Sequence, residues 1–349
     1  MPSSTQELPA SIRDEAHLDD LLSTPTPGVI ERVRSLPGDY IILGVGGKMG
    51  PTLARMLKRA LDEAGLRRRV IGVSRFGSGN LASELQSHGI ETIACDLLDQ
   101  EALDRLPDVQ NVIYMAGMKF GSTGNQARTW AMNTYLAGMT AQKFRHSRIA
   151  AFSTGNVYPL VSVHSGGAKE SDDVGPIGEY AMSCLGRERI FEHFSRSLNV
   201  PVTLLRLNYA VEMRYGVLAD IGRAVFERRP VDVGMGFVNV IWQRDANSVA
   251  FRALSACENP PLVLNLTGPE TLSTREIALG FGKRFGMEPA FQGVESSHAL
   301  LNNAAKCHEL FGCPTVTPET LMNWIAEWLE RGNPQWNKPT HFEVRDGKF

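Results

Sequence analysis

Tyr180 and Cys184 form the residue pair in this chain whose spacing bears most directly on chemistry. Four residues apart, the two side chains lie on the same face of a helix. A tyrosine hydroxyl can exchange a proton with a substrate when a nearby cation lowers its pKa. A free tyrosine titrates near pH ~10, and a neutral thiol supplies no cation. The spacing therefore indicates a proton-transfer site whose activating charge has to come from another residue.

Lys119 and Arg187 are the two candidates for that cation. Lys119 lies in the loop after an apolar run, from which a long side chain could reach a bound ligand. Arg187 is on the same helical stripe as Tyr180, about two turns further on. Each has a plainer interpretation, since Lys119 could contact only a phosphate and helix arginines commonly pair with surface acids. A cation within roughly 4–6 Å of the Tyr180 hydroxyl would favour catalysis, because only that range shifts a pKa strongly.

A glycine-rich segment, residues 44–50, predicts a site for a diphosphate. It follows the short apolar run at 40–43 and precedes apolar residues at helical spacing, which is the context of a dinucleotide-binding turn. Glycine lets the backbone approach a pyrophosphate, and the helix N-terminus supplies free N–H groups. The alternative is a tight structural turn. The expected cofactor contacts here are Gly44, Gly46, Gly47, Lys48, Met49 and Gly50.

The ends of the next two expected strands bear on the choice of cofactor. An acidic residue after the second strand would hold a ribose diol and favour NAD. This chain has Ser74 and Arg75 there, and arginine suits a 2′-phosphate geometrically, so the sequence favours NADP slightly over NAD. Arg75 could also be only a solvated surface charge. Asp96 and Leu97 end the third strand, where the carboxylate could face the adenine amine or be an ordinary loop aspartate.

Strand and helix patterns alternate from residue 39 onwards. The alternation predicts an α/β fold with a Rossmann-type, doubly wound parallel sheet at residues 39–210. Residues 211–349 are expected to form a smaller C-terminal α+β lobe that binds substrate across a cleft. Residues 1–38 are expected to form an N-terminal arm with two short helices. This arm could pack on the body or on a neighbouring subunit, but a surface appendage is the simpler interpretation. The expected strands are 40–43, 70–73, 92–94, 112–115, 149–152 and 202–205, and the expected long helices are 126–145 and 180–197.

Composition and charge exclude several classes of function. The net charge of −2 gives no electrostatic case for nucleic acid or for an anionic membrane. The acidic N-terminus has no long apolar run, so neither a signal peptide nor a membrane span is expected. Five scattered cysteines without a metal-binding pair fit reduced thiols in the cytoplasm, and the histidines show no metal spacing. The expected partner is a small-molecule substrate.

These features together resemble the extended short-chain dehydrogenases, in the NAD-dependent epimerase/dehydratase group. The resemblance runs from about Tyr40 to Trp328, nearly the whole chain beyond the arm. The glycine loop and the pair at 96–97 match the family's cofactor contacts. The stretch at 115–119 resembles the Ala-Gly-x-Lys segment that nucleotide-sugar epimerases place against the cofactor, which implicates Ala116, Gly117 and Lys119.

The resemblance also implies roles around the tyrosine. Tyr180 matches the catalytic tyrosine. The segment at 152–158 resembles the family's Ser-Ser/Thr-x-x-Val-Tyr stretch, which makes Thr154 the match for the catalytic hydroxyl and Asn156 a substrate contact. Asn208 matches an asparagine that faces substrate. Cys184 departs from the family, because it replaces the lysine that activates the tyrosine and binds the nicotinamide ribose. From this position Cys184 is itself expected to contact the cofactor.

Two functions remain open on these residues. The first is an NAD(P)-dependent oxidoreductase or epimerase that transfers hydride to or from a sugar, sugar acid or nucleotide-sugar-like polyol, with Tyr180 as acid/base. The second is a non-catalytic NAD(P)-binding sensor or partner protein that kept the fold and lost turnover. The presence of Thr154, Tyr180 and Asn208 together favours the enzyme. The resemblance further implies a homodimer that pairs through the helices at 126–145 and 180–197.

Overall fold

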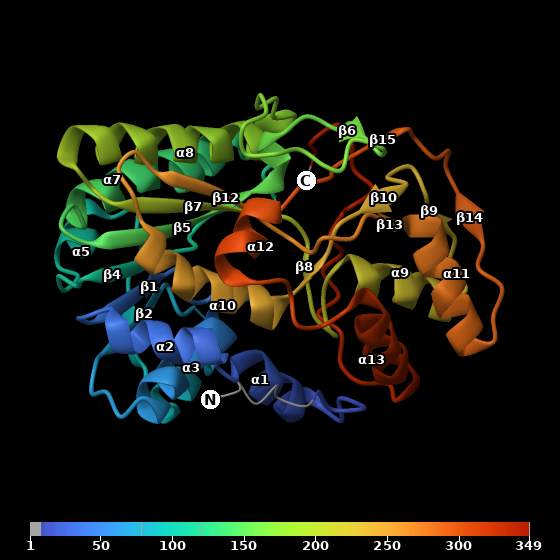
Figure 1. The fold of residues 1–349 in the computed structure, drawn as a ribbon, viewed down its shortest axis with the longest axis horizontal. Coiled ribbons are helices and arrows are strands. Elements are labelled where there is room, and N and C mark those ends of the chain that lie inside the picture. Colours follow the sequence, from blue (N-terminus) through green and yellow to red (C-terminus); the bar gives the residue numbers. More distant parts are fainter. Residues whose placement is uncertain (1–7, 78, 120, 349) are drawn as a thin grey trace.

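A seven-stranded sheet forms the centre of the computed structural model, which describes residues 8–77, 79–119 and 121–348. The strand order is β12-β7-β5-β4-β1-β2-β3, and every pairing is parallel (Figure 1). From β1 the chain adds β2 and β3 on one side of the sheet and then crosses over to add β4, β5, β7 and β12 on the other side. Open parallel sheets bind ligands at such a switch point. The strands are β1 (Tyr40–Leu43), β2 (Val70–Ser74), β3 (Glu91–Ala94), β4 (Asn111–Tyr114), β5 (Arg148–Thr154), β7 (Val202–Leu207) and β12 (Leu262–Leu266).

Helices cover both faces of this sheet, as a buried parallel sheet requires. Each face has its own hydrophobic core cluster. One face packs against α2 (Pro27–Ser35), α3 (Gly50–Glu63), α4 (Leu81–Ser87), α10 (Gln243–Ala253) and α12 (Ala305–Phe311). The other packs against α5 (Gln100–Asp104), α7 (Leu136–Lys143) and α8 (Gly178–Leu198) (Figure 1). The predicted Rossmann-type fold class is confirmed.

The helix expected at 126–145 is interrupted in the structure. It consists of α6 (Gln126–Trp130), a π-helical turn at Ala131–Tyr135 and then α7. A π-turn holds one extra residue and is found frequently at functional sites. Asn133 lies in this turn and is fully buried. Hydrophobic spacing could not reveal the turn, because the residues on both sides of it still follow a helical pattern.

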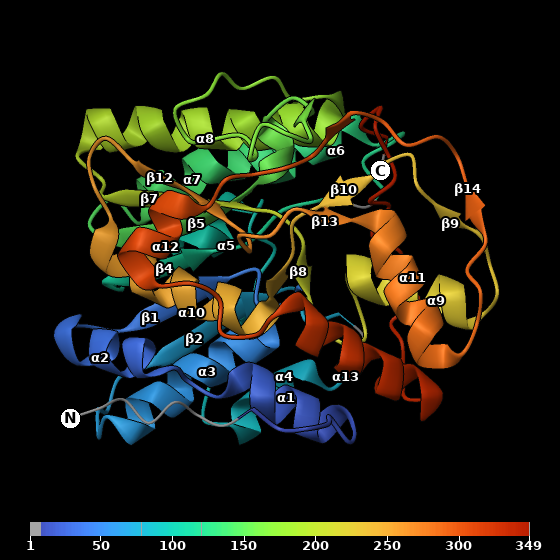
Figure 2. The same cartoon turned by 45° about the vertical axis from the view of Figure 1, so that its right-hand side comes forward.

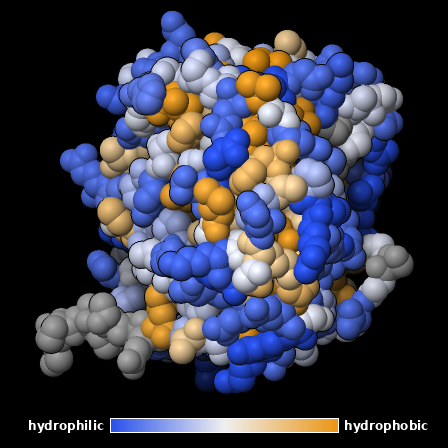
Figure 3. Space-filling model, turned by 90° about the vertical axis from the view of Figure 1, so that its right-hand side faces the viewer, coloured by the Kyte–Doolittle hydropathy of each residue, from blue (hydrophilic) through white to orange (hydrophobic). Residues whose placement is uncertain are grey.

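The smaller lobe consists of three helices and short strand pairs around a third core cluster (Figures 1 and 2). Its outer face mixes apolar with polar residues (Figure 3). Three elements from the predicted lobe belong to the main sheet instead, since α10, β12 and α12 pack there. The lobe contains α9 (Val217–Phe226), α11 (Thr274–Phe285), α13 (Pro318–Glu330), β6 (Val161–Ser162), β8 (Ala210–Val211), β9 (Val231–Asp232), β10 (Phe237–Val238), β11 (Ile241–Trp242), β13 (Leu272–Ser273), β14 (Phe291–Gln292) and β15 (His298–Ala299).

The described part of the N-terminal arm, residues 8–38, packs on the body and is not a surface appendage. Helix α1 (Glu15–Ser23) buries Leu18 and Leu22 in the core of the smaller lobe. Helix α2 buries Val29 and Val33 in the core beside α3. Asp19 of α1 also accepts a hydrogen bond of 2.9 Å from Arg214. The expectation of an appendage was wrong because two helices too short to show a clear apolar stripe still bury every large apolar residue on their inner sides.

The C-terminal tail after α13 returns across the smaller lobe towards the start of α8. Thr340 donates from both its backbone N–H and its hydroxyl to Asp220 of α9, at 2.7 and 2.6 Å. Gly347 lies so close to Gly178 that a Cβ on Gly178 would meet its carbonyl oxygen at 2.4 Å. The tail therefore forms a wall between the two lobes. Within the described ranges no helix is long and apolar enough to cross a membrane, and no cluster of potential metal ligands forms.

Candidate active site

Three pockets form one continuous groove along the carboxyl ends of the central strands. The first, the inter-lobe pocket of about 360 Å³, is lined by Tyr180 and Thr154. A second, of about 250 Å³, shares Met115 and Gly117 with the first. A third, of about 420 Å³, shares Ser74 and Arg75 with the second. The groove has the place and the extent that a dinucleotide needs across the switch point of the sheet.

The glycine loop forms the floor in the middle of the groove. Gly44 has a φ of +90°, and a Cβ there would meet the backbone of Ala116 at 2.8 Å. At Gly50 a Cβ would meet the Val45 carbonyl oxygen at 2.1 Å. These two glycines let β1, β4 and α3 approach one another. Helix α3 begins here without a side-chain cap, so its N-terminal amides remain for an anion. A pyrophosphate fits this cradle.

The residues predicted around the adenosine lie at the far end of the groove. Ser74, Arg75, Asp96 and Leu97 line the second pocket, together with Gly44, Gly46, Gly47, Ala116 and Gly117. Ser74 and Arg75 continue into the third pocket, and no acidic residue is among the described residues that line it.

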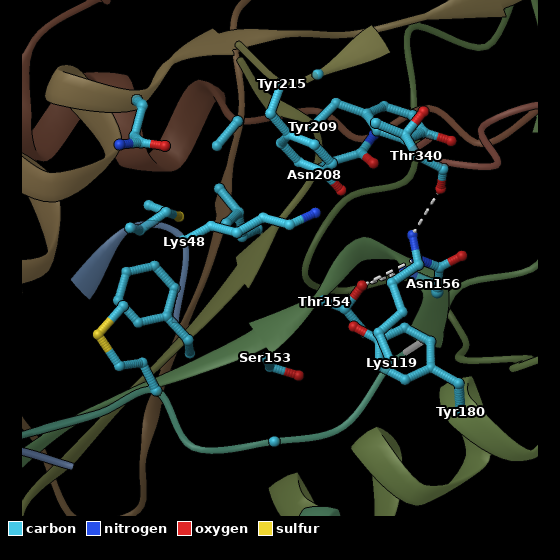
Figure 4. Close-up of a pocket in the computed structure, with 18 of the residues that line it drawn as sticks. Lys48, Lys119, Ser153, Thr154, Asn156, Tyr180, Asn208, Tyr209, Tyr215 and Thr340 are labelled. Carbon is cyan, nitrogen blue, oxygen red and sulfur yellow. Dashed lines mark hydrogen bonds between the residues drawn. The ribbon is translucent and has the colours of Figure 1, made fainter. Parts of the chain in front are cut away.

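Thr154 and Asn156 organise the oxygen side of the tyrosine (Figure 4). Asn156 donates to the Thr154 hydroxyl oxygen from its backbone N–H at 3.2 Å and from Nδ2 at 3.0 Å. With two hydrogen bonds accepted, the Thr154 hydroxyl directs its own proton towards the Tyr180 oxygen. That contact lowers the pKa of Tyr180, as does the Arg187 charge, but burial and the neighbouring Cys184 raise it more. Tyr180 is therefore a phenol at neutral pH.

Arg187 is held rigidly behind this site. Its guanidinium is buried and donates to the Phe152 carbonyl at 2.8 Å, to the Asn133 carbonyl at 3.1 Å and to Asn133 Oδ1 at 2.8 Å. Arg187 also lines the inter-lobe pocket. A Cβ added to Gly117 would meet its Nη2 at 2.5 Å. Arg187 thus carries a fixed positive charge next to the tyrosine, and it does not pair with a surface acid.

Cys184 lies outside the groove. Its side chain is fully buried in a small cluster with Val157, Tyr158 and Ala168, and it lines none of the three pockets. Burial raises the pKa of its thiol. The structure therefore corrects the prediction of Cys184 as a cofactor contact. Its apolar surroundings keep it a neutral packing residue.

Asn133 is a functional residue that the sequence analysis missed. From the π-turn it accepts from the Met118 N–H at 2.8 Å and donates to the Met118 carbonyl at 2.9 Å. It also donates to the Ser183 hydroxyl at 2.9 Å, one residue before Cys184. One side chain thereby fixes the loop after β4, helix α8 and Arg187 relative to one another. Nothing in the sequence distinguishes this asparagine from an exposed helix residue.

A buried ionic network supports the wall of the site from behind. Arg206 donates to both carboxylate oxygens of Glu188, the shortest contact being 2.7 Å, and to the Tyr158 hydroxyl at 2.6 Å. Glu188 also accepts from the Ser153 hydroxyl at 2.5 Å, and Tyr158 donates to Asn265 at 2.9 Å. Because β5 ends at Thr154, this network fixes the strand end that carries the hydroxyl next to Tyr180.

Further residues from both lobes line the inter-lobe pocket. Asn208, predicted to face substrate, lines it and donates to the Leu300 carbonyl at 3.4 Å. Tyr209, Tyr215 and Thr340 line it as well, and the sequence analysis did not find them. Tyr209 and Tyr215 follow the end of β7, where only the observed turn brings them back over the sheet. Thr340 is in a tail segment without periodicity.

Two lysines reach the same pocket from opposite sides (Figure 4). Lys48 of the glycine loop places its Nζ 3.1 Å from the centroid of the Tyr215 ring. Lys119 donates to the Thr340 carbonyl at 3.3 Å, and its Nζ is 5.9 Å from the centroid of the Tyr180 ring. Burial lowers the pKa of Lys48 to about 7 and that of Lys119 to about 8. Met49, the other predicted contact beside Lys48, also lines this pocket.

The fold and groove define an α/β protein of the extended short-chain dehydrogenase type. Residues 40–211 match the family described as the NAD dependent epimerase/dehydratase family. The matched part of the chain contains the glycine loop, Thr154 and Tyr180. No curated protein matches the chain in sequence.

Solved structures of similar shape are proteins named as epimerases and dehydratases. A dTDP-glucose 4,6-dehydratase from Bacillus anthracis in complex with NAD has a TM-score of 0.70 at 16% identity over 89% of this chain and 99% of its own. A UDP-glucose 4-epimerase from Thermotoga maritima has 0.69 at 18%, over 84% and 99%. A UDP-glucuronic acid 4-epimerase from Bacillus cereus with UDP-glucuronic acid and NAD has 0.67 at 18%, over 84% and 99%. At these identities the likeness shows a shared fold.

Proposed function

We propose that the protein is an NAD(P)-dependent oxidoreductase or epimerase that acts on a small polyol, with Tyr180 as acid/base. The observation that carries this proposal is the convergence of Tyr180, Thr154 and Asn208 on the cavity at the inner end of the glycine-lined groove. A groove that served only to bind a dinucleotide would have no need for a second, polar cavity beside a paired tyrosine and threonine. The family match of residues 40–211 supports the same conclusion.

The residues along the groove fit a nicotinamide dinucleotide. The cradle at Gly44, Gly46 and Gly47 would hold the pyrophosphate, and Asp96 with Leu97 would hold the adenine. Ser74 and Arg75 would hold a 2′-phosphate, so we infer a preference for NADP, although two of the solved structures named above contain NAD. When bound, the cofactor would supply the acceptor or donor for a hydride at a substrate carbon.

Tyr180 would move the proton that accompanies hydride transfer. Because burial raises its pKa, the hydroxyl is protonated at neutral pH and would donate to the oxygen of a substrate carbonyl as that carbon gains hydride. In the reverse direction Tyr180 would receive the proton of a substrate hydroxyl. Arg187, which lowers the pKa of Tyr180, would stabilise the tyrosinate, and Thr154 would donate a hydrogen bond to the same oxygen.

A non-catalytic dinucleotide-binding protein is the second candidate. One observation favours it: Cys184 stands where the family has a lysine, and its presence raises the pKa of Tyr180 instead of lowering it. The polar side chains Thr154, Asn156 and Asn208 in the cavity favour the enzyme, because a site that had lost turnover would be free to replace them with apolar ones. Lys119 is a second cation in the same cavity as Tyr180, and its Nζ lies 5.9 Å from the centroid of the Tyr180 ring.

Replacement of the tyrosine tests the proposal. We expect Tyr180→Phe to keep its affinity for NADPH, measured by cofactor fluorescence, and to lose turnover of sugars, sugar acids and nucleotide sugars with NADP⁺ or NAD⁺, measured by cofactor absorbance and by NMR of the products. Tyr135→Phe is the matched control, since Tyr135 is 62% exposed. Equal turnover in wild type and Tyr180→Phe would rule out the acid/base role. Cofactor binding without turnover of any compound in wild type would support the second candidate.

A further inference from the structure

The active-site cavity has a one-sided charge. Among the described residues that line it, three have ionisable basic side chains, Lys48, Lys119 and Arg187, and none is acidic. The whole chain has a net charge of −2, so an excess of basic residues does not explain this lining. A cavity lined by one sign of charge attracts ligands of the other sign, because low-dielectric walls focus the field.

Lys48 is an unusual residue for its position. A glycine loop approaches a diphosphate with its backbone, but the Lys48 side chain extends away from the loop into the substrate side of the cavity (Figure 4). Its Nζ is buried above the face of Tyr215, 3.1 Å from the ring centroid. A buried ammonium group is stabilised further when an anion binds beside it, because the hydrogen bonds between them are charge-assisted.

Lys119 provides the facing cation. Its Nζ donates to the Thr340 carbonyl on the tail. The two lysines are close enough to each other that the charge of Lys119 lowers the pKa of Lys48. The acids whose charges act on Lys48 and Lys119 are Asp220, Glu212 and Glu343, and none of them is among the described residues that line the cavity. Asp220 accepts two hydrogen bonds from Thr340, and Glu212 is paired with Arg214 at 3.2 Å.

We propose that Lys48 and Lys119 form an anion subsite, so that the substrate is a small polyol with a carboxylate or phosphate group and not a neutral sugar. The proposal rests on the proposed function, because it assigns the substrate of that same site. An oxyanion between the two ammonium groups would receive charge-assisted hydrogen bonds from both. It would leave the neighbouring carbinol carbon facing Tyr180 and Thr154. The cavity of about 360 Å³ also has to admit the nicotinamide end of the cofactor, which limits the substrate to a small molecule.

Protonation of Lys48 would make this binding depend on pH. The charged groups that face it are Lys119 in the loop after β4, Lys338 in the tail, Asp220 on α9 and Glu212 after β8. Burial and the two lysines outweigh the two acids, and the pKa falls to about 7. A bound anion favours the protonated ammonium. The affinity for an anion should therefore fall as pH rises above 7, by up to about tenfold per pH unit.

A panel of matched ligands tests the subsite. The probes are hydroxy acids and sugar phosphates of three to six carbons, each paired with its neutral alditol, measured by thermal stabilisation and calorimetry with and without NADP⁺. We expect at least one anion class to bind the wild type more than tenfold tighter than its neutral partner, and the class that does so distinguishes carboxylate from phosphate. Lys48→Met should weaken that anion by roughly 10- to 100-fold, the size of a lost charged hydrogen bond.

Two controls separate this role from a structural one. Lys48→Arg keeps the charge and should retain anion binding, while the onset of the pH-dependent loss moves from about 7 to about 8, because arginine does not titrate there and Lys119 does. Lys58→Met removes a lysine from the exposed side of α3, where it pairs with Asp62, and should bind anions as the wild type does.

Three outcomes would overturn the proposal. Neutral alditols that bind as tightly as every anion would show that the cavity does not select charge. Unchanged anion affinity in Lys48→Met would remove Lys48 from the subsite. Loss of NADPH affinity in Lys48→Met, with anion binding intact, would assign the lysine to the cofactor. Failure of the wild type to bind NADPH or NADH, with anions still bound, would instead count against the proposed function alone.

Discussion

Introducing the missing lysine is the most informative change to this site. Cys184→Lys would restore the family's tyrosine–lysine spacing. The natural chain, however, already holds a cation beside the tyrosine, since the buried Arg187 guanidinium is fixed by three hydrogen bonds to Asn133 and Phe152. We expect Cys184→Lys to destabilise the protein and not to raise its activity, because a second ammonium group would enter the same apolar surroundings.

The magnitude follows from the helix geometry. Residues three apart on a helix have Cβ atoms about 5–6 Å apart. Two unit charges at roughly 6 Å, with an effective dielectric constant of ~20, repel by about 3 kcal/mol. An unfolding entropy of about 2 cal/mol/K per residue converts this to a drop of about 4 °C in the unfolding midpoint of a chain of this length. The lysine escapes the repulsion only by losing its proton, and a neutral amine cannot stabilise a tyrosinate.

The assay is denaturant unfolding of four proteins at neutral pH: wild type, Cys184→Lys, Cys184→Met and Cys184→Lys with Arg187→Met. Cys184→Met fills the site with similar bulk and no charge, so the difference between it and Cys184→Lys isolates the charge. In the double variant the coupling between the two changes should be favourable by about 3 kcal/mol. If Cys184→Lys is as stable as Cys184→Met, or if it turns over substrate faster than wild type, Arg187 does not occupy the role of the missing lysine.

Three further changes test the cofactor cradle, the buried network and the assembly. Gly47→Asp should weaken NADPH binding by at least about 100-fold, because a carboxylate beside a pyrophosphate costs several kcal/mol; retained fluorescence enhancement of the reduced cofactor would argue against the cradle. Glu188→Gln should lower the free energy of unfolding by about 3–5 kcal/mol through the unpaired Arg206, while Glu192→Gln on the exposed side of α8 should change it by less than about 0.5 kcal/mol; equal losses would contradict the network's importance. The wild type should elute as a dimer in light-scattering chromatography and Tyr135→Asp, on the predicted pairing helix, as a monomer; a monomeric wild type would exclude this pairing.

The sheet and its order of elements could be predicted because local pattern and tertiary environment agree there. The run Tyr40–Leu43 is fully buried on both faces, so continuous apolar character was enough to find it. Helix α11 has clear local signals at both ends, since Ser273 caps its first turn and Gly286 ends it with a φ of +64°. The arm was misjudged because its burial depends on surfaces that α3, α10 and the smaller lobe provide.

The parts of the site that depend on the conformation of the backbone could be predicted from the sequence. Gly44 and Gly50 are required by close contacts of the main chain, and such contacts leave a sequence pattern. The direction in which a long side chain points leaves no such pattern in the sequence. Lys48 turns towards Tyr215 because a turn after β7 places that ring over the sheet. Whether Arg187 points to solvent or inwards depends on Asn133, whose position depends in turn on a π-turn.

That π-turn makes the length of this helix a strict requirement. A single residue more or less in an α-helix rotates all that follows by about 100°. Deleting one residue from the segment 131–135 would restore a regular helix and move the Asn133 amide away from Met118, Ser183 and Arg187 together. The helix should therefore tolerate substitutions of its exposed residues but not the deletion of one residue. In a scan of single-residue deletions across 126–143, every deletion before Leu136 that shifts this register should disorder the cofactor site.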